Sequence, residues 1–282
     1  MSHIFYTMLQ IGQYNTLKVL RNTKVGLFLG DEEHDVLLPN KYVPKEYFIG
    51  DEMTVFVYLD HEERPVATTL KPYVKLNEFA HLKVNFINKF GAFLDWGLEK
   101  DLFVPFKEQA VNMEVNKRYL IYVYLDEQTN RLVATSKVNK YFSEDFPSYE
   151  PNQEVEVMIS HFTDLGINVI IENKYKGLAF SGEVFKDLRL GTKTKAYIKQ
   201  VRPDGKIDVM FKKVGVESID DDAAILLKEL KANNGYLGLT DKSHPEEIKS
   251  VLQMSKKSFK KAVGNLYKQR VIEIRENGIS LL

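Results

Sequence analysis

An internal repeat constrains the fold of this chain more than any other feature of its 282 residues. Three blocks recur in the same order: residues 26–29 (GLFL) as 91–94 (GAFL), 55–60 (VFVYLD) as 121–126 (IYVYLD), and 64–69 (RPVATT) as 131–136 (RLVATS). Because the order is kept and the spacing drifts by only one residue across each loop, the blocks indicate two copies of one structural unit.

A third, fainter copy follows over residues 155–211. It ends in two alternating apolar and polar segments that flank Pro203-Asp204-Gly205-Lys206. An Asp-Gly pair between such segments supplies the positive φ of a tight hairpin turn. The sequence therefore predicts three related β modules in tandem.

Each module reads as short strands of period two, separated by Gly, Pro, Asn and Asp. Five strands in 65 to 70 residues fit the five-stranded OB-fold barrel, which closes its own sheet edges. Another all-β sandwich or an SH3-like barrel remains the alternative. The predicted fold class is mainly β, with a small α+β C-terminal domain.

The C-terminal region changes to a helical period from Glu217. We expect one helix to begin at Asp220-Asp221-Asp222, a second to open with a capping box at Ser243 and turn Ile248, Val251 and Leu252 inward, and a third to follow Met254-Ser255. A hairpin through Asn277-Gly278 completes a winged helix. The predicted domains are residues 1–70, 71–145 and 146–215 as barrels, and 216–282 as the winged helix.

Three motifs carry a family resemblance. Residues 89–97 (KFGAFLDWG) resemble the FGAFVDxG strand pair of the ribosomal S-one RNA-binding domain, 50–55 (GDEMTV) its GDxVxVxV segment, and 176–184 (KGLAFSGEV) its KGLVHISEI segment. With the repeated blocks and the basic C-terminal helix, nearly the whole chain is similar to the bacterial conserved virulence factor B family, most strongly over residues 9–140. That family is described as three tandem S-one domains and a winged helix that bind RNA and affect gene expression, so the resemblance implies this fold and this activity here.

The resemblance also implies a stacking face of three positions per barrel, made of an aromatic before the glycine, a second aromatic two residues after it, and a His on the third strand. The first two positions hold Val25 and Phe28 in module one, Phe90 and Phe93 in module two, and Leu165 and Asn168 in module three. The His position is expected near Leu38, near Val104 and at Phe180. Because only module two has both aromatics, we expect the modules to differ in binding strength.

Exposed aromatic rings flanked by cations are what single-stranded RNA requires of a protein surface. Candidate RNA-binding residues of the barrels are Phe28, Lys83, Lys89, Phe90, Phe93, Arg131 and Phe180. Phe90 and Phe93 can share a face only if the strand bends or bulges at Gly91, and burial in the core is the competing interpretation. For Trp96, the single tryptophan, packing is the preferred interpretation.

The third C-terminal helix adds Lys257, Lys260, Lys261 and Lys268 to the candidates. Residues 248–272 contain seven Lys or Arg and no acidic residue, which favours phosphate contact. A solvated helix face and a protein-interaction surface are the alternatives, since charge runs and winged helices serve both.

No catalytic or cofactor motif is present. The six His residues are scattered, Cys is absent, and no phosphate loop or dinucleotide glycine pattern occurs, so we expect no enzyme activity, metal or cofactor. No apolar segment is long enough to span a membrane, and a cytoplasmic location is expected. The leading hypothesis is a regulator of gene expression that binds single-stranded RNA, with DNA or protein open as partners of the winged helix. The alternative is an interaction adaptor of the ribosome or the transcription machinery.

Overall fold

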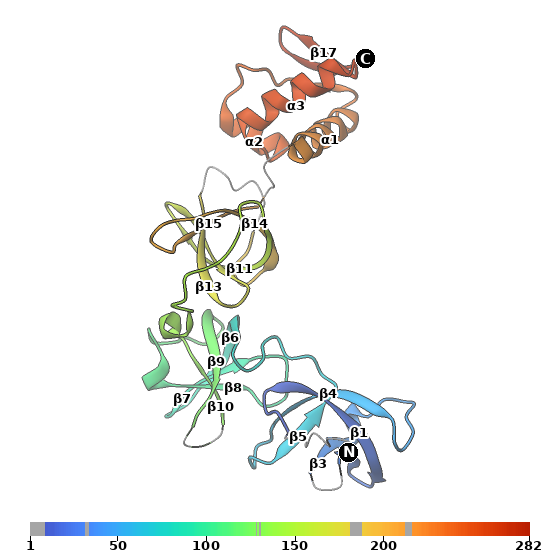
Figure 1. Cartoon of the computed structure of the whole chain (residues 1–282), viewed down its shortest axis with the longest axis vertical. Coiled ribbons are helices and arrows are strands. Elements are labelled where there is room, and N and C mark those ends of the chain that lie inside the picture. Colours follow the sequence, from blue (N-terminus) through green and yellow to red (C-terminus); the bar gives the residue numbers. More distant parts are fainter. Residues whose placement is uncertain (1–8, 32–33, 128, 130, 181–187, 212–215) are drawn as a thin grey trace. The chain divides into compact units, whose positions relative to one another are not determined.

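The computed structural model describes residues 9–31, 34–127, 129, 131–180, 188–211 and 216–282. The chain divides into two compact units, Met1–Tyr141 and Phe142–Leu282. The first unit contains two barrels, and the second contains a third barrel and the C-terminal domain (Figure 1).

Each of the three modules is a closed five-stranded barrel, as predicted. The strands of barrel 1 are β1 (Gln13–Thr23), β2 (Gly26–Gly30), β3 (Asp35–Pro39), β4 (Glu52–Leu59) and β5 (Pro65–Thr68). Those of barrel 2 are β6 (Phe79–Ile87), β7 (Gly91–Asp95), β8 (Leu102–Pro105), β9 (Arg118–Leu125) and β10 (Leu132–Thr135). Those of barrel 3 are β11 (Glu154–Thr163), β12 (Gly166–Ile171), β13 (Tyr175–Phe180), β14 (Lys193–Val201) and β15 (Ile207–Met210). Short 3-10 helices lie at Asn40–Tyr42, Phe106–Glu108 and Val138–Tyr141.

The glycine that opens the second strand of every barrel is required by close packing. A Cβ atom added to Gly91 would lie 2.2 Å from the carbonyl oxygen of Val104 on the third strand. The corresponding clashes at Gly26 and Gly166 are at 2.1 and 2.0 Å. Only glycine lets the two backbones approach so closely, which explains why this position survives in all three copies.

A β-bulge interrupts the first strand of each barrel. Strand β7 pairs regularly with β8 from Gly91, the position at which a bend or bulge would let Phe90 and Phe93 share a strand face. The register shifts lie between Val19 and Arg21, between Val84 and Phe86, and between Ile159 and His161. After each bulge, the outward side chain of the first strand faces a partner on the second strand: Arg21 faces Phe28, Phe86 faces Phe93, and His161 faces Asn168. The bulge therefore determines which side chains meet on the barrel surface.

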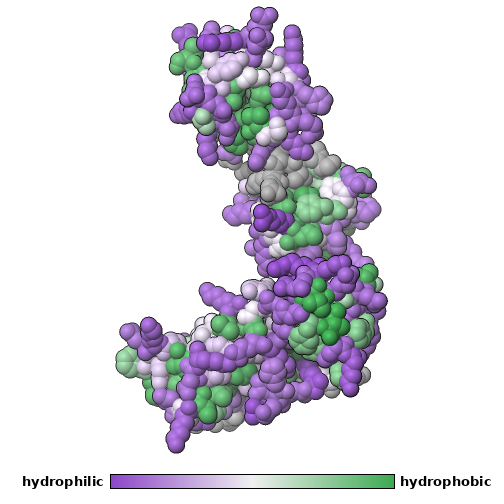
Figure 2. Space-filling model, turned by 180° about the vertical axis from the view of Figure 1, so that it is seen from behind, coloured by the Kyte–Doolittle hydropathy of each residue, from purple (hydrophilic) through white to green (hydrophobic). Residues whose placement is uncertain are grey.

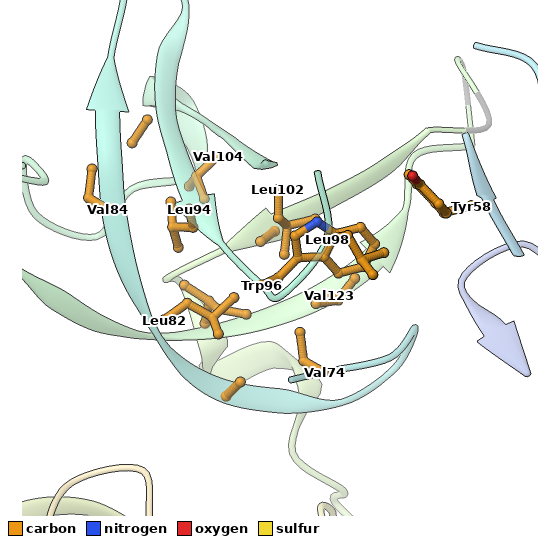
Figure 3. Close-up of a cluster of buried hydrophobic side chains, with 14 of the residues drawn as sticks. Tyr58, Val74, Leu82, Val84, Leu94, Trp96, Leu98, Leu102, Val104 and Val123 are labelled. Carbon is orange, nitrogen blue, oxygen red and sulfur yellow. The ribbon is translucent and has the colours of Figure 1, made fainter. Parts of the chain in front are cut away.

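Trp96 is a packing residue, in agreement with the preferred interpretation. It is 3% exposed and lies among Leu98, Leu102 and Val123 of barrel 2 (Figure 3). Its indole N–H donates to the carbonyl oxygen of Lys100 at 2.6 Å. The ring also meets two aromatic side chains of barrel 1 edge-on, Phe56 at 5.8 Å and Tyr58 at 6.2 Å between centroids. One apolar cluster thus spans both barrels of the first unit.

The C-terminal domain is a winged helix. It consists of α1 (Val216–Ala232), β16 (Tyr236–Leu237), α2 (Pro245–Leu252), α3 (Lys256–Lys268), β17 (Ile272–Arg275) and β18 (Gly278–Leu281), with the strands in the order β16-β18-β17. The inward faces of the three helices share one core, which contains Leu226, Ile248, Phe259 and Leu266.

Three local predictions for this domain were wrong. Helix α1 begins at Val216, so Asp222 is buried within the second turn of the helix rather than placed at its start. The N-cap of α2 is His244, whose ring nitrogen accepts the backbone N–H of Glu246, while Ser243 accepts that of Thr240. Val251 is 40% exposed because the α2 core needs only Ile248 and Leu252.

Candidate nucleic-acid interface

Three phenylalanine side chains form a stack across the surface of barrel 2. Phe86 on β6 and Phe93 on β7 are nearly parallel, with 4.4 Å between ring centroids and 7° between planes. Phe93 meets Phe103 on β8 at 5.0 Å and 36°. The three residues are direct cross-strand neighbours, and we call them the aromatic ladder. Phe86 is 46% exposed, so one end of the ladder is open to solvent.

Phe90 extends the aromatic surface from the turn between β6 and β7. Its ring is 62% exposed, and the Lys89 ammonium lies 5.0 Å from the ring centroid. The side chain of Asn88 fixes this turn by accepting the backbone N–H of Phe90 at 2.8 Å. Phe90 and Phe93 border one groove, so the structure brings these two candidates together.

A groove of about 710 Å³ lies between barrel 1 and barrel 2, within the first unit. We call it the inter-barrel groove. Barrel 2 lines it with the aromatic ladder, Phe90, Trp96 and the charged residues Glu99, Lys100, Asp101 and Arg131. Barrel 1 contributes Tyr58, Leu59, His61 and Glu63. Apolar flat walls with a few charged groups are suited to a base rather than to a polyanion alone.

Ion pairs and hydrogen bonds across the groove hold the two barrels together. Arg131 pairs with Glu63, and Glu99 pairs with Lys41, which lowers the pKa of Glu99. The Lys100 ammonium donates to a barrel 1 carbonyl, that of Asp60, at 2.6 Å. Burial lowers the pKa of Lys100. Arg131 therefore lines the groove as predicted, but it is engaged by a carboxylate of the other barrel.

Burial also affects the tyrosines near this junction. It raises the pKa of Tyr58 to about 12, and it raises that of Tyr42 to about 12 together with the nearby Glu99 carboxylate. Both hydroxyls therefore stay protonated at neutral pH.

The predicted third-strand positions were off by one or two residues. Leu38 and Val104 are fully buried in their barrels, because alternate residues of a strand point inward. The strand register places Leu37 opposite Phe28, Phe103 opposite Phe93, and Leu178 opposite Asn168. Sequence reasoning consequently missed Phe86 and Phe103, although the alternation around Val104 could have identified Phe103.

In the described part of barrel 1, the ring at the ladder position of the second strand is covered. The guanidinium of Arg21 lies 4.1 Å from the centroid of the Phe28 ring, and it pairs with Asp35 at 2.6 Å. The position that Phe86 occupies in barrel 2 is thus held by an arginine that covers Phe28. In the strand register, Lys83 of β6 lies opposite Asp95 of β7 and Arg118 of β9. It does not line the groove.

Barrel 3 arranges its aromatic candidate differently. Phe180 ends β13 and has two cations near its ring, Lys199 and Arg202, each 5.7 Å from the centroid. Arg202 also donates two hydrogen bonds from its guanidinium to the buried Asp208 carboxylate, at 2.7 and 2.9 Å. The ladder positions hold His161, Asn168 and Leu178, so no phenylalanine stack forms at these three positions.

The predicted basic face of α3 is present. Lys257, Lys260, Lys261 and Lys268 are exposed, and Lys260 lies 3.8 Å from Asp241. Within the described part of the chain, Lys257, Lys261 and Lys268 form no ion pair. Gly264, on the same helical face, leaves open space beside these lysines.

Figure 2 shows that apolar residues reach the surface in separate groups bordered by hydrophilic ones. Among the described residues, no cluster of three or more His, Asp or Glu could hold a metal ion. In the same ranges, no helix has the length and apolar character needed to cross a membrane.

Comparisons with known proteins agree with this architecture. The family model described as S1 domain matches residues 11–70, and the model described as CvfB-like winged helix domain matches residues 224–281. The chain is 28% identical to the uncharacterized protein YitL of Bacillus subtilis, over 95% of this chain and 92% of that protein. It is 28% identical to conserved virulence factor B of Staphylococcus aureus (strain N315), over 84% of this chain and 81% of that protein.

Among solved structures, a multidomain protein with nucleic acid binding domains from Streptococcus pneumoniae covers 96% of this chain and 98% of its own length, at 23% identity and a TM-score of 0.43. The domain and relative matches confirm the resemblance that the sequence motifs carry. Together, the S1 and winged helix domains indicate a nucleic-acid-binding protein.

Proposed function

We propose that this chain, which resembles conserved virulence factor B over most of its length, is a non-catalytic RNA-binding protein that regulates gene expression after transcription. The observation that carries the proposal is the aromatic ladder of barrel 2 beside the inter-barrel groove. A stack of rings open at one end is a surface on which a base can continue the stack.

The ladder favours single-stranded over duplex RNA. Bases in a duplex are stacked on one another and cannot lie flat on Phe86 or Phe90, whereas an unpaired base can. Each stacked base contributes about 1 to 3 kcal/mol to binding. Lys89, whose ammonium lies 5.0 Å from the centroid of the Phe90 ring, is placed to meet a flanking phosphate, and Arg131 lines the same groove.

In this proposal the modules contact RNA in different ways. The modules are residues 1–70, 71–145 and 146–215 as barrels and 216–282 as the winged helix. Barrel 2 stacks bases through Phe90 and Phe93. Barrel 1 forms one side of the groove and stacks no base on Phe28, because Arg21 covers that ring. Phe180 of barrel 3 and the α3 lysines supply further contacts to the RNA. Lys83 serves as a phosphate contact outside the groove.

Fluorescence anisotropy with labelled RNA tests the proposal. Wild type, Phe86→Ala/Phe93→Ala and the control Phe48→Ala are titrated with a single-stranded RNA, the matched DNA and the RNA duplex. Phe48 is 76% exposed and lies outside the groove, so its loss removes an exposed ring without touching the ladder.

We expect single-stranded RNA to bind most tightly, and the double variant to bind about 10- to 100-fold more weakly, since one stacked base is lost. The Phe48 variant should bind like wild type. Absence of RNA binding by wild type would contradict the proposal and favour the alternative of a protein-interaction adaptor.

A further inference from the structure

We propose that Asp101 makes the inter-barrel groove selective for nucleobases that carry an exocyclic amino group. This inference rests on the proposed function, because it concerns which base the aromatic ladder accepts. It assigns a specificity role to a residue that the motifs of the chain do not single out.

The position of Asp101 is set by the same strands that build the ladder. Asp101 directly precedes β8, two residues before Phe103, and it lines the groove with Phe86, Phe93 and Phe103. Its partner is Asn85, the residue before Phe86, whose amide nitrogen donates to Asp101 Oδ1 at 2.9 Å. This hydrogen bond fixes the carboxylate beside the stacking surface and leaves Oδ2 able to accept a further hydrogen bond.

Asp101 differs from the other carboxylates of the groove in its partner. Glu63 is neutralised by Arg131, and Glu99 is neutralised by Lys41. Among the groove-lining carboxylates of the described chain, Asp101 alone has no cationic partner. Burial raises the pKa of this carboxyl group. A desolvated carboxylate without a cation gains more from an added N–H donor than a paired one does.

The edge of a stacked base supplies such a donor. A base that lies flat on the ladder turns its edge toward neighbouring polar groups, and carboxylates accept hydrogen bonds from amino groups of bases. Adenine, cytosine and guanine have an exocyclic amino group, whereas uracil presents a carbonyl oxygen where cytosine has that group. The uracil oxygen and the Asp101 carboxylate would repel each other. A phosphate group would be repelled as well, so the base and not the backbone belongs here.

The other two barrels lack this arrangement. In barrel 1 the corresponding residue is Asp35, two residues before Leu37, and it is bound to Arg21 at 2.6 Å. In barrel 3 the corresponding residue is Lys176, two residues before Leu178. An unneutralised carboxylate beside an open aromatic stack is therefore particular to barrel 2 among the three barrels as described.

The test uses the full chain and short uridine-rich RNAs of one length that differ at a single central base. The matched pairs are cytidine against uridine, guanosine against inosine, and adenosine against purine riboside. The second member of each pair lacks the exocyclic amino group, and uridine has a carbonyl oxygen in its place. Affinities are measured by fluorescence anisotropy for wild type, Asp101→Asn and Glu114→Gln. Glu114 is exposed, pairs with Lys117 and lies outside the groove, so its variant removes the same charge elsewhere on barrel 2.

We expect wild type and Glu114→Gln to prefer the amino-bearing member of each pair by about tenfold, the magnitude of one hydrogen bond to a charged group. In Asp101→Asn the preference should fall to about twofold or less, because an amide both donates and accepts and so satisfies uracil as well. Affinity for the uridine RNA should stay unchanged or rise.

Equal binding of the matched RNAs by wild type, with Phe86→Ala/Phe93→Ala still weakening both, would overturn the selectivity and leave the proposed function intact. A preference that persists in Asp101→Asn would also overturn the assignment to this residue. Absence of RNA binding by wild type would overturn the proposed function, and this inference with it.

Discussion

The surface position that follows the bulge of the first strand holds a different type of residue in each barrel: Arg21 in barrel 1, Phe86 in barrel 2 and His161 in barrel 3. In barrel 2 a phenylalanine there completes a stack, while in barrel 1 an arginine covers the neighbouring ring. The fold is the same in both cases. The side chain at this position therefore decides whether the ring on the second strand is stacked or covered, while the third-strand position also differs, with Leu37 in barrel 1 and Phe103 in barrel 2.

Replacing that arginine should build a second stack. In Arg21→Phe we expect the new ring to pack against Phe28 as Phe86 packs against Phe93, raising the affinity for single-stranded RNA several-fold. Lys45→Phe, in the loop before β4, removes a cation and adds a ring at an exposed site outside β1, β2 and β3, and it should have little effect. Anisotropy titration measures both, and equal affinities of the two variants would contradict the account.

The buried carboxylate of barrel 3 gives a prediction about stability. Burial raises the pKa of Asp208, but hydrogen bonds from Arg202 and Gln200 outweigh burial, so the net pKa is lowered. A lowered pKa in the folded state means that the stabilisation is present above the pKa of about 3.9 of the unfolded chain and is lost as the pH falls through the folded value.

Asp208→Asn should therefore destabilise barrel 3 at pH 7 by about 2 to 4 kcal/mol, since it leaves Arg202 without its charged partner. Hydrogen exchange of β13 and β15 in the full chain, compared with wild type from pH 7 to pH 3, measures the effect. The difference should hold down to about pH 4 and narrow below it. Unchanged exchange at pH 7 would show that the Arg202–Asp208 pair does not stabilise the barrel.

At the scale of elements, the repeat and the alternation of residues were sufficient to predict the five strands of each barrel and the helices of the winged domain. They were not sufficient to predict the register. A bulge adds one residue to one strand, and its position cannot be predicted from the alternation of residues on the partner strand. For this reason Phe86 was missed, whereas Phe103 lies on a strand of regular register and could have been identified from the alternation around Val104.

Helix ends were harder to predict than helix faces. The inward positions Phe259 and Leu266 follow from period and hydrophobicity. The cap of α2 depends on a single hydrogen bond, and several neighbouring residues could have supplied it. The basic face of α3 was predictable because its lysines recur at helical spacing without an intervening acid.

The α3 face predicts a change in salt dependence. In Lys257→Ala/Lys261→Ala/Lys268→Ala, three phosphate contacts are removed, which should reduce the slope of log affinity against log salt by about 2 for single-stranded RNA. Lys228→Ala/Lys231→Ala/Lys242→Ala removes the same charge from other parts of the domain and should change the slope much less. An unchanged slope in the first variant would argue for a solvated or protein-binding face.

At the scale of the molecule, the groove belongs to neither of the two barrels alone. The sequence repeat describes each barrel by itself, whereas the junction depends on residues that the copies do not share, such as Trp96 and Glu99. No pattern within one module indicates that its neighbour will pack against it. The groove could therefore be found only from the coordinates.

The single tryptophan can report on this junction. Trp96 is buried between the barrels and also lines the groove, so RNA bound there should change its fluorescence. We expect a saturable change in Trp96 emission on titration with single-stranded RNA, at the same midpoint as anisotropy. The change should be weakened in Phe86→Ala/Phe93→Ala. RNA binding without any change in emission would place the contact away from the groove.

The most direct measurement of the central claim is photochemical crosslinking of the full chain to a single-stranded RNA that contains 5-iodocytidine, which keeps the exocyclic amino group, followed by mass spectrometry of the linked peptides. The account predicts that the dominant crosslinks fall on the ladder and its turn, within residues 86–103 of barrel 2, and that Phe86→Ala/Phe93→Ala reduces them. Crosslinks confined to barrel 1, or spread evenly over the chain and unaffected by the double variant, would contradict it.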